Sequence, residues 1–401
     1  QVLAERQLAH VGGGAVGDDV AGLHLIAHAH DRALVDAGRL VGALELGQAV
    51  DVDARTAGVE LVGGAHDDAG AVDLLDDAAL ICALRMWLAL VPRCDSVADV
   101  PPLPNLDRCI RQGDALIDPL DTRADAAAWK GSRRLRFIVR QLEPAGREYV
   151  TAGPETRSTL RRRIRRLEKG LARAWITIAA QQGEAEAAEL HARSADRDLF
   201  GEPTGPARAA RERLPAVRRR IEQLRNAARD VDDAGIIPFF SFPVHFPAAI
   251  YGFDLILSNP PWVRAHSWPA ATSSLLRDRY RVCRSAGWPY AAQLSGTPSG
   301  AGTQVDLSFL FLERCISLLR PGGTLGMLLP AKLLRSLAPG GARHLLQSET
   351  PVTYIEDHSL DQRAIFRADA FTSVVVARRC DAARSRPVHV RMTRGTAVDL
   401  E

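Results

Sequence analysis

The chain has 401 residues, of which 46% are hydrophobic and 25% charged, and its formal net charge is +3. This length allows two domains, and the composition is that of a protein with a buried core. No apolar run approaches the roughly eighteen residues of a membrane span, and the six cysteines are scattered. We therefore expect a cytoplasmic protein without a disulfide framework.

The first eighty residues differ from the rest of the chain. They carry 4 basic and 14 acidic side chains, which leaves 47 basic and 34 acidic side chains for residues 81–401. The later excess of positive charge favours a polyanion such as nucleic acid, although the preference for arginine over lysine also fits GC-rich coding. Because residues 1–80 lack aromatics, Pro, Asn and Ser, they would form a poor core and poor turns. We interpret residues 1–72 as an atypical low-complexity leader, either helical or the product of a shifted reading frame.

The chain begins with Gln1 and not with Met, which indicates a fragment, and no secretory signal is recognisable.

Two patterns in this leader imitate functional motifs. No β-rich strand precedes residues 12–14, a Gly-Gly-Gly run, so a nucleotide loop is not predicted. His24 and His28 have helical spacing, but no third ligand completes a site, and we predict no metal.

Two acidic residues follow next. Asp73 precedes an apolar segment, 78–91, that is predicted to be a helix, and the helix dipole alone would favour an acid there. A short strand is expected within 103–112 and ends at Gly113-Asp114, which is also a common turn pair.

An insertion is predicted at residues 117–235. Apolar residues recur at helical spacing in 160–178 and in 214–231, and a Gly/Pro stretch at 201–206 separates the two segments. We expect an antiparallel helical hairpin. Its many arginines either contact phosphate or are simply solvated.

The next feature is a strand that stops abruptly. Residues 253–258 are typical of a buried strand, and Asn259-Pro260-Pro261-Trp262 follows it. Proline has no N–H for a strand ladder, and the residue before a proline is held extended. Because ligands of α/β sheets bind at the carboxyl ends of strands, this corner is a candidate site with an amide, proline carbonyls and an aromatic ring.

The remaining elements are predicted in the following order. Residues 263–304 read as a long loop, 306–319 as a helix, 320–323 as a turn, 324–330 as a buried strand, and 351–357 and 371–377 as two more strands. Phe366 lies between the last two strands, where it is either a core residue or part of a site. Residues 381–401 are interpreted as the start of a truncated C-terminal region.

The Asn-Pro-Pro-Trp corner resembles the Asn-Pro-Pro-aromatic motif of S-adenosylmethionine-dependent amino-methyltransferases. The order of parts resembles the TaqI-like gamma class of adenine-specific DNA N6-methyltransferases, of the large restriction-modification or phage-defence type. The resemblance implies a class I methyltransferase fold, a Rossmann-like doubly wound α/β sheet with a helical insertion. It divides the catalytic domain into residues 73–116 and 236–380.

The resemblance also implies roles for individual residues. Asn259, Pro260, Pro261 and Trp262, together with Phe366, would hold a flipped adenine of double-stranded DNA and promote methyl transfer to its N6 amine. Asp73 and Asp114 would bind the ribose and the adenine edge of S-adenosyl-L-methionine. Subunits of a restriction or defence system are the expected protein partners.

Two departures keep other functions open. The glycine-rich first motif of the family is not recognisable, and no target-recognition domain follows the last strand. The alternatives are an inactive fragment, a DNA-binding subunit, or a methyltransferase acting on protein glutamine or RNA.

Overall fold

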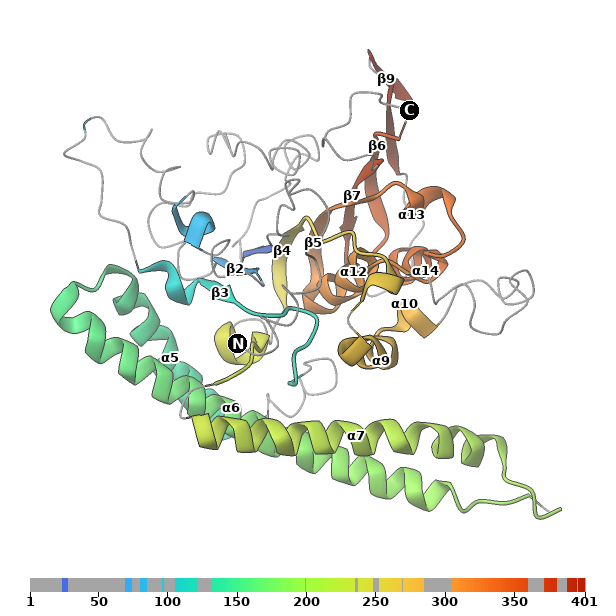
Figure 1. Cartoon of the computed structure of the whole chain (residues 1–401), viewed down its shortest axis with the longest axis horizontal. Coiled ribbons are helices and arrows are strands. Elements are labelled where there is room, and N and C mark those ends of the chain that lie inside the picture. Colours follow the sequence, from blue (N-terminus) through green and yellow to red (C-terminus); the bar gives the residue numbers. More distant parts are fainter. Residues whose placement is uncertain are drawn as a thin grey trace.

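A nine-stranded mixed sheet forms the centre of the protein (Figure 1). The computed structural model describes residues 24–27, 69–73, 80–84, 96, 105–120, 131–198, 200–234, 237–247, 252–268, 270–284, 305–359, 371–380, 388–394 and 396–400. The strands are β1 (His24–Ala27), β2 (Ala69–Asp73), β3 (Ile110–Gln112), β4 (Phe253–Ser258), β5 (Leu319–Pro330), β6 (Val352–Asp357), β7 (Thr372–Arg378), β8 (His389–Arg394) and β9 (Thr396–Leu400). Their order across the sheet is β3-β2-β1-β4-β5-β7-β6-β8-β9.

Six of the nine strands point in one direction. The pairs β2–β3, β4–β5 and β6–β8 are parallel, whereas β1, β7 and β9 run antiparallel to their neighbours. The order 3-2-1-4-5 is that of a doubly wound sheet, in which the chain changes direction of travel between β1 and β4. The predicted α/β fold with a mostly parallel sheet is confirmed, and its topological switch point lies beside β4.

The helices are distributed between the sheet and a separate arm. They are α5 (Arg133–Thr151), α6 (Pro154–Arg193), α7 (Gly205–Ala234), α8 (Phe242–His245), α9 (Ala270–Arg279), α10 (Arg281–Arg284), α12 (Leu307–Leu318), α13 (Lys332–Arg335) and α14 (Gly340–Ser348), with 3-10 turns η4 (Leu106–Arg108) and η6 (Ala265–Ser267). Helices α9, α10, α12 and α14 gather beside β4 and β5, and α5 to α7 form the arm (Figure 1).

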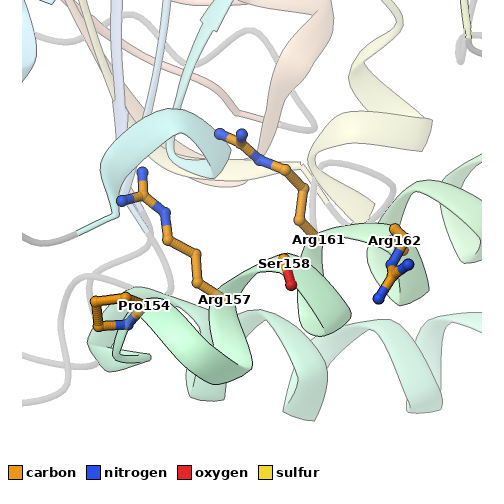
Figure 2. Close-up of a pocket in the computed structure, with 5 residues that line it drawn as sticks. All are labelled: Pro154, Arg157, Ser158, Arg161 and Arg162. Carbon is orange, nitrogen blue, oxygen red and sulfur yellow. The ribbon is translucent and has the colours of Figure 1, made fainter.

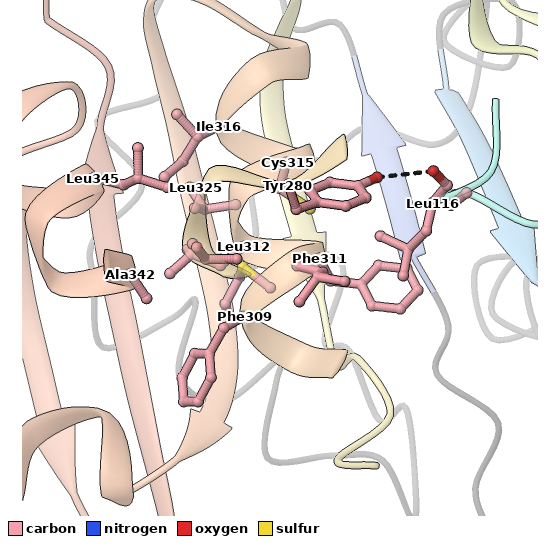
Figure 3. Packing of buried hydrophobic residues seen from close by; sticks show 14 of the residues in the cluster. Leu116, Tyr280, Phe309, Phe311, Leu312, Cys315, Ile316, Leu325, Ala342 and Leu345 are labelled. Carbon is pink, nitrogen blue, oxygen red and sulfur yellow. Dashed lines mark hydrogen bonds between the residues drawn. The ribbon is translucent and has the colours of Figure 1, made fainter. Parts of the chain in front are cut away.

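The main core lies between the sheet and α12. Phe309, Leu312 and Ile316 of α12 are buried, with Leu325 of β5 on one side and Leu345 of α14 on the other (Figure 3). The opposite face of the sheet holds residues that alternate with these along the strands. There, the described helical segment 80–84 packs against β3, so both faces of the sheet carry helix.

The arm has a core of its own. Leu171 and Trp175 of α6 are buried with Leu142 of α5 and Leu224 of α7. Ion pairs between α6 and α7 join Arg173 to Asp232 near the base of the hairpin, and Glu184 to Arg225 further out. From the first pair to the second, the residue number rises on α6 and falls on α7. The two helices are therefore antiparallel, as expected.

Several elements differ from the sequence expectations. Strand β2 begins at Ala69, four residues before the predicted boundary at Asp73, and residues 24–27 of the leader form strand β1 of the same sheet. The predicted loop at 263–304 contains the short helices α9 and α10, and α5, α13 and α14 were not predicted. Helix α5 does carry an apolar stripe, which includes Leu135, Val139, Leu142 and Tyr149, but Pro144 in its interior favours a break over a continuous helix.

Helix α8 connects the two cores and contains a histidine whose pKa is lowered. Phe242 packs in the sheet core and Val244 in the arm core. Nδ1 of His245 lies 3.1 Å from the backbone nitrogen of Ser241 and 2.9 Å from its carbonyl oxygen, so it accepts from the first or donates to the second according to the tautomer of the ring. Burial, followed by the charge of Arg111, lowers the pKa of His245 to about 4.

Acid is therefore expected to destabilise the fold through His245. The folded-state pKa lies below the unfolded value of 6.5, so the unfolded chain binds the proton more tightly. Stability should fall by about 2–3 kcal/mol between roughly pH 6.5 and 4. Urea unfolding of His245→Asn, which keeps an acceptor for the Ser241 N–H, should show a flatter dependence over this window. An identical slope in both proteins would contradict the assignment.

Candidate active site

The predicted corner lies at the carboxyl end of a central strand. Strand β4 starts after Gly252, whose φ of +80° and close approach to the backbone of Arg320 leave no room for a Cβ. It ends at Ser258, which is buried and hydrogen-bonded to Cys315 of α12. Asn259 follows directly and is half-buried, while Pro260 is buried. Since β4 borders the switch point, the corner lies where doubly wound sheets bind ligands.

The alternation of side chains along β4 determines which face of the sheet the corner residues occupy. Ser258 is on the face of the sheet that α12 covers, so Asn259, held extended by Pro260, continues on the opposite face with Leu257. Trp262 packs against that same face, on Leu328 of β5 and Val374 of β7. Asn259 and Trp262 therefore come to the same side of the sheet edge.

Helix α12 anchors the chain that leaves the corner. The carbonyl of Val263, one residue beyond Trp262, accepts a hydrogen bond of 2.9 Å from the N–H of Leu307 and one of 3.3 Å from Nε1 of Trp268. Both donors belong to segments that pack in the main core. The corner is thus a rigid turn, held at one end by the sheet and at the other by the start of α12.

An ion pair between a buried aspartate and a partly exposed lysine lies next to this anchor. Asp306, 3% exposed and preceding α12, pairs through Oδ2 with Nζ of Lys332, which follows the end of β5. Oδ1 of Asp306 is buried and has no hydrogen-bond partner in the part of the chain that the structure describes. Sequence reasoning missed this pair, because its two members are 26 residues apart and belong to different elements. The N-terminal position of Asp306 before α12 was the one available signal.

The two predicted cofactor acids lie at neighbouring strand ends. Asp73 is the last residue of β2, and Asp114 follows β3 by two residues, with β2 and β3 parallel in the register Asp73↔Gln112. Oδ1 of Asp114 accepts hydrogen bonds of 2.8 and 3.1 Å from the N–H groups of Leu116 and Ile117. Asp114 therefore also stabilises its own turn, the alternative that its Gly-Asp sequence left open.

Burial raises the pKa of Asp114, against the two backbone hydrogen bonds that lower it. A raised folded pKa favours the fold at low pH and weakens it as the pH rises through that value. Asp114→Asn keeps the acceptor Oδ1 without the charge, so its stability relative to wild type should increase from about pH 4 upward and then level off. Thermal unfolding at a series of pH values measures this, and a constant difference between the two proteins would refute it.

The structure does not place two other parts of the predicted site, Phe366 and a cofactor loop, at the carboxyl ends of the described strands. Phe366 lies outside the described residues. Strand β1 runs antiparallel to β4, with His24 opposite Ser258. Its last residue, Ala27, is therefore at the opposite end of the strands from the corner. A loop after a parallel first strand, which holds the phosphate or methionine part of ligands in such sheets, is therefore not supplied by β1. Of the two acids, Asp114 has a described carboxylate that accepts hydrogen bonds, which is the chemistry that a hydroxyl or amine of a ligand requires.

No helix among the described residues is both long and apolar enough to cross a membrane. In the same ranges, no group of three or more His, Cys, Asp or Glu side chains is arranged to hold a metal ion.

A family model and one known relative match parts of this chain. The family model described as Eco57I restriction-modification methylase matches residues 70–362, which begin within β2 and include the corner and the arm. The type II methyltransferase M.XhoI of Xanthomonas vasicola is 24% identical over 139 residues, which are 34% of this chain and 22% of that protein. The alignment thus spans about a fifth of this relative's length.

Solved structures give weak overall superpositions. A Listeria monocytogenes protein assigned to the class I S-adenosylmethionine-dependent methyltransferases has a TM-score of 0.27 and 12% identity, covering 70% of this chain and 93% of that one. A chain from a type I restriction-modification system has a TM-score of 0.22 and 12% identity, covering 80% and 72%. The family match extends over well more than half of the sequence. The chain belongs to the Eco57I restriction-modification methylase family.

Proposed function

We propose that the chain carries the catalytic corner of a DNA methyltransferase that transfers a methyl group from S-adenosyl-L-methionine to the N6 amine of adenine in double-stranded DNA. It would act in the cytoplasm, together with subunits of a restriction or defence system. The observation that carries the proposal is the rigid Asn259-Pro260-Pro261-Trp262 turn after β4, at the switch point of a doubly wound sheet.

The chemistry required is activation of a poor nucleophile. The lone pair of the N6 amine is conjugated with the adenine ring. Asn259 Oδ1 and the carbonyl of Pro260 would accept hydrogen bonds from its two N–H groups and draw the nitrogen toward tetrahedral geometry. The same acceptors would stabilise the positive charge that develops on this nitrogen. S-adenosylmethionine, when bound, supplies an electrophilic methyl group, and the proton leaves N6 to solvent after the transfer.

Adenine must leave the duplex to reach the corner, because its amine is not accessible within the stack. Trp262, which rests on Leu328 and Val374, would offer a fixed ring for stacking against the flipped base, and Phe366 would cover its other face. Asp73 and Asp114 would orient the ribose and the adenine of the cofactor. With these roles, the acids at the ends of β2 and β3 and the corner after β4 would form one site along the carboxyl ends of the parallel strands.

Methyl transfer from labelled S-adenosylmethionine to duplex DNA, followed by nucleoside mass spectrometry, tests the proposal. N6-methyladenine is the expected product, and Asn259→Ala should form it at least about a hundredfold more slowly. A product on cytosine, on RNA or on a protein glutamine would contradict adenine specificity.

A second candidate is a DNA-binding subunit without activity of its own. The antiparallel β1 favours it, because within the described residues β1 does not lead the chain toward the end of the sheet where the corner lies. Retention of labelled S-adenosylmethionine by the purified chain separates the two functions, since the second predicts none.

A further inference from the structure

The first four turns of α6 carry a strong local excess of positive charge. Residues 154–169, which we call the basic start of α6, contain six arginines and one lysine but only two acids, Glu155 and Glu168. Glu168 is buried and already pairs with Arg111 of β3 at 2.5 Å. Five of the arginines are exposed, at positions 157, 162, 163, 165 and 166.

The outer part of the same hairpin is different. There, Glu184 and Glu186 of α6 pair with Arg225 and Arg213 of α7, and Glu189 pairs with Arg193. A charged helix that is only solvated typically shows such alternating, mutually paired charges. The basic start of α6 has one exposed acid for its five exposed arginines, so its charge is not balanced along the helix.

An open pocket of about 410 Å³ lies on this surface, lined by Pro154, Arg157, Ser158, Arg161 and Arg162 (Figure 2). Arg157 and Arg161 extend to the same side of α6, toward η4 (Figure 2). Arg161 is fixed by Asp107 at 2.5 Å, and Asp107 also accepts a hydrogen bond from Tyr149. One guanidinium of the pocket is therefore held in place before any ligand arrives, and the first turn of a helix adds partial positive charge.

The spacing of the arginines suits a polymer of phosphates. Residues 157, 161 and 165 recur every fourth position, as do 162 and 166, and at 1.5 Å per residue neighbouring members are about 6 Å apart along the axis. Two base-pair steps of a duplex advance each strand by nearly the same distance, about 7 Å. A single small anion would occupy the pocket but would not explain the rows beyond it.

The basic start of α6 contacts β3 and the η4 turn that precedes it. Arg111 connects α6 to β3, the edge strand of the sheet, and three strand spacings of about 5 Å separate β3 from β4. A duplex that contacts both the basic start of α6 and the corner would have to cross these strands, and four to five base-pair steps span about 15 Å.

From these observations we propose that the basic start of α6 binds the phosphate backbone of duplex DNA flanking the methylated adenine, without reading sequence. This rests on the proposed function. Arginines on phosphate fix the position of a duplex, whereas sequence is read from base edges. The surface would hold the DNA while the corner captures the flipped base.

Salt-dependent binding to a fluorescently labelled duplex tests the surface. The variant Arg157→Gln/Arg162→Gln/Arg166→Gln removes three exposed charges and keeps good helix formers. Between about 50 and 200 mM salt, the slope of log affinity against log salt should decrease in magnitude by about 3, with at least about tenfold weaker binding at the lower salt. The matched control, Arg208→Gln/Arg218→Gln/Arg229→Gln on α7, removes the same charge from exposed positions and should change the slope by less than about 1.

Three results would overturn the inference: an unchanged slope in the α6 variant, an equal change in both variants, or tighter binding of a duplex RNA that the α6 variant loses. Methylation assays on the same proteins keep this question separate from the proposed function. A wild-type chain that methylates adenine but shows an unchanged α6 slope refutes only the surface. A chain that gives no N6-methyladenine but shows the α6-specific loss keeps the surface and rejects the activity.

Discussion

Replacing Asn259 by alanine is expected to reduce the turnover of adenine methylation by about a hundredfold or more, with DNA affinity nearly unchanged. The lost acceptor interacts most strongly with the charge that develops on N6 in the transition state, so the loss appears in kcat. Asn259 is half-buried at the end of β4, and the two following prolines hold the backbone, so the truncation should not disturb the fold. Single-turnover rates with saturating duplex measure the effect.

Asn105 provides a matched control for this experiment. Its side-chain amide is buried and donates to the carbonyls of Tyr149 and Ala152, at 2.8 and 3.1 Å. Asn105→Ala should lower stability but leave the rate per folded molecule intact. If Asn259→Ala retained wild-type turnover, or weakened DNA binding as much as turnover, the amine-acceptor role of Asn259 would be wrong.

Breaking the buried pair of Arg314 and Asp118 should cause the largest loss of stability. Arg314 is 1% exposed, and its Nη2 lies 2.9 Å from Oδ2 of Asp118, which is fully buried. The carboxylate also accepts from the N–H groups of Phe242 and Leu120, so it joins α12 to α8 and to the turn after β3. Asp118→Ala leaves a guanidinium without its counter-charge, which typically costs about 3–5 kcal/mol.

Urea unfolding of Asp118→Ala measures this loss, and the exposed pair of Arg193 and Glu189 on α6 is its control. These two side chains lie 2.6 Å apart but are 60% and 62% exposed, so Glu189→Ala should change stability by less than about 1 kcal/mol. Comparable losses from the two substitutions would show that the Arg314 pair contributes no more than a surface contact.

The sequence was most informative where one local pattern determines one element. The apolar runs at 253–258 and 324–330 correctly predicted β4 and most of β5, whereas the turn predicted at 320–323 is part of β5. The two amphipathic segments of the insertion became α6 and α7. In each case the period of apolar residues and a breaker at the end act together over a few neighbouring residues.

Long-range pairing was not accessible in this way. Nothing near Asp118 in the sequence indicates that Arg314 would neutralise it, and nothing near Asp306 indicates Lys332. The antiparallel direction of β1 depends on which partners it finds in space, because a four-residue strand has no directional signal of its own. Trp262 was predicted as a stacking residue from its motif, but its contacts with Leu328 and Val374 required the assembled sheet.

The hairpin of α6 and α7 also bears on the order in which the chain folds. Gln112 and Phe253 belong to the same sheet but are separated by the whole arm, and the entropy of closing a loop grows with its length. Helices form within about a microsecond, whereas distant strands meet more slowly. Because the hairpin turns the chain back on itself, with Arg173 beside Asp232, early pairing of α6 with α7 brings the two halves of the sheet together. We expect the folded arm to shorten the effective loop between β3 and β4 and so to lower the entropy cost of bringing these strands into one sheet.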